Sequence, residues 1–192
     1  DPQKRDSSYY DLFASEARLG SFVSIARGDV PPVHWLAMAR PFGSIGNRRV
    51  LLSWGGTMFE YLMPLLVQRL YPHSLLEMAC REAVGAQMEY GRRRGVPWGI
   101  SESAYSDLDA NKTYQYQAFG VPGTGLKRGL EDDLVVAPYA TLLALLVEPA
   151  AAVRNLKRLA RLGLRGAYGF FEAIDFGRQR LREGGDGVIV RA

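Results

Sequence analysis

The chain has 192 residues, of which 47% are hydrophobic and 23% charged, enough for one domain with a sizeable core. The formal net charge of +4 is too small a field for nucleic-acid binding. A single cysteine, Cys80, excludes a disulfide framework, and the two isolated histidines indicate neither a metal site nor a cofactor.

The first 54 residues predict two helices and one strand. Residues 1–8 are polar and typical of a linker, and the helix that follows is expected to end at Gly28. The segment PPVHWLAMAR begins with a proline pair that favours a second helix start, and this helix should stop before Pro41. The segment RRVLLSW, residues 48–54, is typical of a short strand.

Two further helices have recognisable start signals. Thr57 can cap a helix over residues 57–70, which its internal proline should kink. Ser74 and Glu77 form a capping-box pattern before the clearest amphipathic helix of the chain, residues 74–93.

The second half predicts a long loop followed by more helices. Residues 98–130 are expected to have little regular structure, and loops of this length in a compact domain are usually functional. Helices are expected at about 133–148, 149–162 and 167–175, and the tail REGGDGVIVRA indicates a turn and a final strand.

A hydrophobic run at residues 134–153 has the length of a membrane span and contains a single charge. Pro138 and Pro149 interrupt it, so we interpret it as buried core helices. The basic residues after it fall on one helical face, which is either solvated or in contact with the rest of a larger protein: Arg154, Lys157, Arg158 and Arg161.

These elements predict a mainly α architecture of helical hairpins packed around a centre, with short strands between them. The apolar faces of the helices over residues 57–70, 74–93 and 133–148 are expected to pack together.

Three glutamates stand in sequence environments suited to chemistry. Glu16 in LFASEARLGSF and Glu60 in MFEYLM have apolar neighbours, which raise the pKa of a carboxyl and favour a proton donor. Glu102 in WGISES lies between two serines, where a carboxylate ionises more easily and can attack or stabilise positive charge. Two carboxylates in different environments are the minimum for glycoside chemistry. The structural alternatives are an ion pair of Glu16 with Arg18, and a buried Glu60 paired with a basic or hydroxyl group.

Four longer motifs resemble one known family: YYDLFASEARLGSFVSIARGDVPPVHW, SWGGTMFEYLMPLL, WGISES and GLKRGLEDDLVVAPYAT. Together they are similar to the glycoamylase-like domain of cyclic β-1,2-glucan synthases, over nearly the whole chain. The resemblance implies an (α/α)6 toroid with a sugar cleft at one end. A toroid of this kind has about twice the helices predicted here, so residues 1–192 are expected to be a single domain that is only part of the toroid, within a larger polypeptide.

The resemblance also implies an activity, namely anomer-retaining transglycosylation that cuts linear β-1,2-glucan and joins it to its own non-reducing end. Glu102 matches the nucleophile and Glu16 the general acid/base, which acts directly or through a substrate hydroxyl. A directly acting retaining pair would lie about 5–5.5 Å apart, and a relayed pair about 6.5–9.5 Å apart. The candidate sugar contacts are Arg18, Trp54, Glu60, Trp98, Ser101, Tyr105, Tyr114, Tyr116, Phe119, Lys127 and Arg128.

The partners implied are the β-1,2-glucan itself and other domains of the parent polypeptide, with no nucleic acid and no membrane span in this chain. The implied location is the cytoplasmic side of the bacterial inner membrane, as part of a larger membrane protein. Related domains act as endo-β-1,2-glucanases, so hydrolysis is one alternative. A non-catalytic module that binds glucan or a neighbouring domain is the other.

Overall fold

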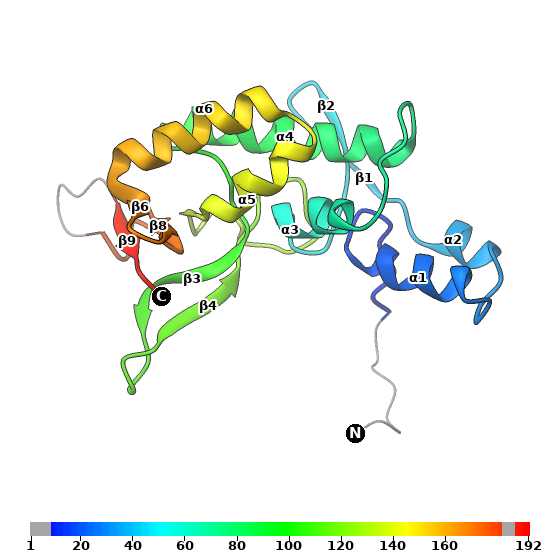
Figure 1. Cartoon of the computed structure of the whole chain (residues 1–192), viewed down its shortest axis with the longest axis horizontal. Coiled ribbons are helices and arrows are strands. Elements are labelled where there is room, and N and C mark those ends of the chain that lie inside the picture. The colour runs from blue at the N-terminus through cyan, green and yellow to red at the C-terminus, as the bar shows by residue number, and fades with distance from the viewer. Residues whose placement is uncertain (1–8, 182–186) are drawn as a thin grey trace.

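Helices and short strands alternate along the chain in the computed structural model, which describes residues 9–181 and 187–192 (Figure 1). The chain is 39% helix and 20% strand, so the expected mainly α class is only partly right. The expected linker at residues 1–8 and the turn before the last strand lie outside the described residues, except for the end of that turn.

The first helix, α1 (Ala17–Ala26), begins later than the sequence pattern indicates. Backbone bonds of 2.9 Å from Phe13 to Ala39 and 3.0 Å from Ala39 to Asp11 hold the preceding segment beside the end of the next helix, α2 (Val33–Ala37). Because of this tertiary pairing, the helix begins only at Ala17, with Glu16 as its N-cap residue.

A hairpin follows, made of β1 (Phe42–Ile45) and β2 (Arg48–Leu51), paired antiparallel. The sequence pattern predicts only the second of these strands. Gly46 occupies the turn at a φ of 55°, a conformation that glycine adopts without steric cost. The hairpin leads through residues 52–57 to α3 (Met58–Leu62) and the 3-10 turn η1 (Met63–Leu66).

The central helix is α4 (Leu75–Arg94), capped by Ser74 and ended by Gly95 in the left-handed conformation. It packs against α3, which in turn contacts α5 (Pro138–Leu143). After α5 come the 3-10 turn η2 (Ala144–Leu146) and α6 (Pro149–Leu159), which lies beside α4 in Figure 1. One hydrophobic core joins buried side chains of α3, α4, α5 and α6, which confirms the predicted packing of the first three.

The predicted loop over residues 98–130 is partly wrong, because β3 (Glu102–Leu108) and β4 (Tyr114–Ala118) form an antiparallel hairpin within it. The hairpin extends away from the helices in Figure 1. Asp109 organises its turn by accepting hydrogen bonds from the backbone N–H groups of Asn111 and Thr113.

The predicted helix over residues 167–175 is wrong. After the π-helical turn η3 (Ala160–Leu164), this part of the chain forms β6 (Arg165–Gly166), β7 (Gly169–Phe170) and β8 (Ala173–Asp175). β8 is the middle strand of an antiparallel sheet, between β5 (Val135–Val136) and β9 (Val188–Val190), so partners distant in sequence decide its conformation. The predicted final strand is confirmed by β9.

The hydrophobic run at residues 134–153 is divided among β5, α5, η2 and the start of α6. Its central residues contribute to the two hydrophobic cores, as the interruption by prolines indicates. Within residues 9–181 and 187–192, no helix has both the length and the apolar composition needed to cross a membrane.

Candidate functional site

Glu102 is the first residue of β3, at the end of the hairpin that joins the body of the domain, and it is partly buried. Burial raises the pKa of its carboxyl, and the negative charges of Glu16 and Glu60 raise it further. The hydroxyl of Tyr116, 3.5 Å from Oε2 of Glu102, acts in the opposite direction and lowers the pKa. The charges of Glu16 and Glu60 therefore both act on the carboxyl of Glu102.

Glu16 reaches the same region from the N-terminus of α1. Its Oε1 accepts a hydrogen bond of 2.6 Å from the hydroxyl of Tyr10, whereas its Oε2 is buried and has no protein partner among the described residues. The ring of Tyr10 stacks on Trp54 with centroids 6.1 Å apart, and the indole Nε1 of Trp54 is likewise buried without a partner there. A buried acceptor and a buried donor are thus left for a ligand or water.

Glu60 is confirmed as a buried carboxylate bonded to a hydroxyl group, with only 2% of its surface exposed. Besides the hydroxyl of Ser53, the backbone N–H groups of Trp54, Gly55 and Thr57 donate to its two oxygens. Thr57 and Glu60 also form a complete capping box at the start of α3. The predicted sugar contact at Glu60 is therefore not retained, because the carboxylate is enclosed by the loop that it orders.

Arg18 is also a structural residue in this fold, contrary to its predicted role in binding sugar hydroxyls. Its guanidinium is buried and donates to the backbone carbonyls of Ala14, Ser15, Glu60 and Tyr61, at distances between 2.5 and 3.1 Å. Burial lowers the pKa of the guanidinium. This cation joins the N-terminus of α1 to α3 and so fixes the position of Glu16, while its Nε is buried without a hydrogen-bond partner among the described residues.

The predicted aromatic contacts fall into two groups. Trp98 and Phe119 are 8% and 2% exposed, so they belong to the hydrophobic cores and are not available to a sugar. Phe119 supports Tyr105 through an edge-to-face contact with centroids 5.6 Å apart. Of the other predicted aromatic contacts, Trp54 stacks on Tyr10 and Tyr116 bonds to Glu102, so both lie at the glutamates and both are at least partly exposed. Tyr105 and Tyr114 are partly exposed but pack against the second hydrophobic core.

Ser101, the residue before Glu102, has no exposed surface. Its hydroxyl links its own segment to two others. Its Oγ accepts hydrogen bonds from the backbone N–H of Phe59 at 3.0 Å and from the hydroxyl of Tyr139 at 2.8 Å. The predicted sugar contact at Ser101 is therefore replaced by a positioning role for the residue before Glu102. Tyr139 was missed by the sequence analysis, although it lies within the quoted segment APYAT.

The two basic candidates, Lys127 and Arg128, are exposed. The ammonium of Lys127 donates to the backbone carbonyl of Ala118 at the end of β4, at 2.9 Å, and its backbone N–H donates to the carbonyl of Trp54. The loop that contains Lys127 thus connects the hairpin to the Trp54 segment. Close backbone approach requires glycine here, since a Cβ on Gly120 would lie 1.8 Å from the carbonyl oxygen of Gly55.

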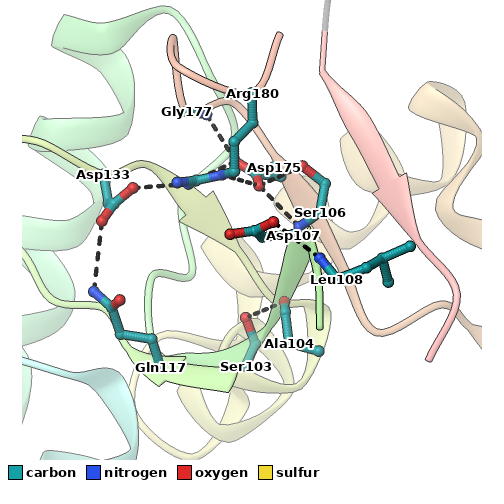
Figure 2. A network of polar contacts seen from close by, with 10 residues as sticks. All are labelled: Ser103, Ala104, Ser106, Asp107, Leu108, Gln117, Asp133, Asp175, Gly177 and Arg180. Atoms are coloured by element: carbon teal, nitrogen blue, oxygen red, sulfur yellow. Dashed lines mark hydrogen bonds and ion pairs between the residues drawn. The ribbon is translucent and has the colours of Figure 1, made fainter. Parts of the chain in front are cut away.

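A buried polar network fixes the other side of the hairpin, as Figure 2 shows. Asp175 on β8 accepts from the backbone N–H and the hydroxyl of Ser106 on β3, and from Arg180 at 2.6 Å. Arg180 also pairs with Asp133 at 2.7 Å and lies over the ring of Tyr105. Burial raises the pKa of Asp175, but the bonds from Arg180, Ser106 and Gly177 outweigh it and hold the pKa below its usual value.

The residues that the fold brings together are Glu16, Glu102, Tyr10, Trp54, Tyr116 and Tyr139, and we refer to them as the carboxylate site. Tyr10 was also missed by the sequence analysis, because nothing local shows that it will bond to a glutamate six residues later. Within residues 9–181 and 187–192, no group of three or more His, Cys, Asp or Glu side chains is placed to hold a metal ion.

Comparison with known proteins places this chain in one family. The family model described as putative glucoamylase matches residues 8–185, so the chain belongs to this glycoamylase family. A curated relative, the cyclic beta-(1,2)-glucan synthase NdvB of Rhizobium meliloti (strain 1021), is 49% identical over 186 residues. This alignment covers 97% of the present chain but only 7% of the relative.

Solved structures share the fold at low sequence identity. An endo-beta-1,2-glucanase from Chitinophaga pinensis, in complex with sophorotriose and glucose, has a TM-score of 0.53 at 15% identity. The match covers 74% of this chain and 36% of that one. A putative glucoamylase from Bacteroides fragilis NCTC 9343 has a TM-score of 0.54 at 20% identity, with 76% and 36% covered. The chain therefore has the fold of part of these larger, toroid-type domains.

Proposed function

We propose that the chain processes β-1,2-glucan by retaining transglycosylation, with Glu102 as nucleophile and Glu16 as general acid/base. One observation carries the proposal. Glu16 and Glu102 each have a single tyrosine hydroxyl as their side-chain hydrogen-bond partner among the described residues, and the charge of Glu16 helps to raise the pKa of Glu102. The identity to a cyclic glucan synthase and the fold shared with an endo-β-1,2-glucanase support the choice of substrate.

In the first step, a carboxylate oxygen of Glu102 attacks the anomeric carbon and the glycosidic bond to the leaving oxygen breaks. The proton for that oxygen comes from Glu16, either directly or through a substrate hydroxyl. The product of this step is a glycosyl ester on Glu102 and a released glucan fragment.

In the second step, the hydroxyl at the non-reducing end of the same glucan attacks the anomeric carbon. The ester bond to Glu102 breaks, and the proton of the attacking hydroxyl returns to Glu16. Two inversions retain the anomeric configuration, and no water is consumed. Hydrolysis would follow the same first step, with water in place of the terminal hydroxyl.

The residues around the pair suit this chemistry. Tyr10 holds Oε1 of Glu16 and leaves the buried Oε2 for the proton that moves in each step. The partly exposed ring of Trp54 and the exposed ring of Tyr116 provide flat faces on which the C–H surfaces of glucose can pack. Arg18 and Ser101 act by positioning the two glutamates.

We further infer that the chain forms part of an (α/α)6 toroid completed by other segments of a larger membrane-associated polypeptide. The 7% coverage of the synthase and the 36% coverage of the solved structures support this inference. The cytoplasmic side of the inner membrane is the location expected for such a polypeptide.

The test is incubation of linear β-1,2-glucan with the protein in its full natural length, followed by mass spectrometry. Cyclisation yields rings that are one water lighter than linear chains with the same number of glucose units. Shorter linear products alone would favour the hydrolase, and glucan binding without any product would favour the binding module. In either case the transglycosylation proposal is wrong.

A further inference from the structure

Glu172 is a carboxylate outside the predicted pair, in the turn between β7 and β8. Its Oε1 accepts a hydrogen bond of 3.2 Å from the backbone N–H of Ala104, two residues after Glu102 on β3. Asp175 accepts the next such N–H along the strand, that of Ser106, at 3.0 Å. Two carboxylates thus take the place of a neighbouring strand at this edge of β3.

Glu172 and Asp175 differ in how many of their carboxylate oxygens still lack a hydrogen-bond partner. Asp175 has no exposed surface, and both of its oxygens are bonded to Arg180 and nearby groups. Glu172 is only partly buried, and its bond to Ala104 involves one oxygen. The described residues provide no protein partner for Oε2, and the side chain is partly exposed. If Glu172 only anchored β3, its second carboxylate oxygen would have no role.

Two tyrosines locate Glu172 relative to the carboxylate site. Burial raises the pKa of Tyr139, and the charges of Tyr116, Glu102 and Glu172 contribute further. The pKa of Tyr116 is also raised, first by burial and then by the charges of the same two glutamates. The hairpin register pairs Ala104, whose N–H bonds to Glu172, with Tyr116, and the hydroxyl of Tyr116 lies 3.5 Å from Oε2 of Glu102.

We propose that Glu172 is a substrate-binding residue of the carboxylate site, which holds β3 through Oε1 and accepts a hydrogen bond from a glucose hydroxyl through Oε2. The inference rests on the proposed function, because it takes β-1,2-glucan as the ligand. A carboxylate oxygen is a strong acceptor for a sugar hydroxyl, because a hydrogen bond to a charged group is stronger than one between neutral groups.

Substitution by glutamine separates binding from anchoring. Glu172→Gln retains one oxygen for the N–H of Ala104 but replaces the free acceptor with an NH2 donor. We expect kcat/KM for linear β-1,2-glucan to fall about ten- to a hundredfold, mainly through KM, with little change in the melting temperature. Glu89→Gln is the matched control, because Glu89 lies on α4 beside Arg48 and outside the carboxylate site. It should behave as the unchanged protein.

Glu172→Ala removes both oxygens and should lower the melting temperature as well as kcat/KM. All variants are assayed in the protein of full natural length, by turnover and by calorimetric binding of linear β-1,2-glucan. If Glu172→Gln matches the unchanged protein in KM, kcat and glucan affinity, Glu172 only anchors β3 and this inference is wrong, while the proposed function stands. If the unchanged protein neither binds nor converts the glucan, the proposed function fails and this inference fails with it.

Discussion

Two regions of the domain each contain a partly or fully buried glutamate, but the two carboxylates differ in how many hydrogen bonds they accept from the protein. In the loop over residues 53–60, the oxygens of Glu60 accept hydrogen bonds from a serine hydroxyl and three backbone N–H groups. At the start of the β3–β4 hairpin, the side chain of Glu102 has one tyrosine hydroxyl at 3.5 Å and remains partly exposed. The first carboxylate is fully engaged in ordering its loop, whereas the second retains acceptors for a ligand.

The difference shows that burial alone does not identify a functional carboxylate. Asp175 repeats the pattern of Glu60, with no exposed surface and every oxygen bonded. Glu16 repeats that of Glu102, because only Oε1 has a protein partner among the described residues. Unused hydrogen-bonding capacity therefore separates the proposed reacting pair from the structural acids.

The largest effect is expected from removing the proposed nucleophile. Glu102→Gln should lower kcat about 10⁴-fold or more, because an amide cannot form the glycosyl ester. Calorimetry should show that the variant still binds linear β-1,2-glucan, since the side chain keeps its shape. A variant that loses glucan binding but keeps a normal kcat would contradict the assignment of Glu102 as nucleophile. Glu89→Gln is the control.

The opposite outcome is expected for Glu60. Glu60→Ala leaves the N–H groups of Trp54, Gly55 and Thr57 without their acceptor, which should reduce the free energy of unfolding by about 3–5 kcal/mol. Denaturant unfolding measures this loss. The kcat of the molecules that remain folded should change by less than about tenfold. A stable but inactive variant would show that Glu60 takes part in the reaction.

A smaller loss of stability is expected from Asp175→Asn, about 2–3 kcal/mol at neutral pH, because the charge-assisted bonds to Arg180 are weakened. The pKa of Asp175 is lowered in the folded state, so its contribution is present above the unfolded pKa and is lost as pH falls through the folded pKa. The stability difference between the two proteins should therefore be constant near neutral pH and shrink below about pH 4. A difference that grows on acidification would contradict this account.

The smallest effect concerns the pH profile. A nucleophile must be ionised, so activity should fall as pH decreases through the pKa of Glu102, which lies above that of an ordinary glutamate. Tyr116→Phe removes the hydroxyl that lowers this pKa, and it should move the acidic limb of kcat/KM upward by less than about one pH unit. If Tyr116→Phe instead shifts an alkaline limb, Glu102 acts as the proton donor and the two roles are exchanged.

Local signals in the sequence were sufficient where a helix end or a motif is decided by neighbouring residues. The capping box at Thr57, the cap at Ser74 and the end of α4 at Gly95 all follow from contacts within one turn. The turn residues DANK between two tyrosine-containing runs could have predicted the hairpin β3–β4. The length of the segment without helical periodicity favoured a loop instead. The segment AYGFFEAID has no local feature that decides between helix and strand.

By itself, the sequence determined the family and the elements with strong caps, because these depend on motifs and short-range contacts; the pair Glu16 and Glu102 stays a prediction from the same motifs. Only the tertiary structure decided which polar residues face a ligand. Glu60 and Ser101 look as suitable for sugar binding as Glu102 in one dimension, yet the fold encloses both among partners of its own. The physical reason is that a polar group is free for function only when no distant segment satisfies it, and long-range contacts settle that question.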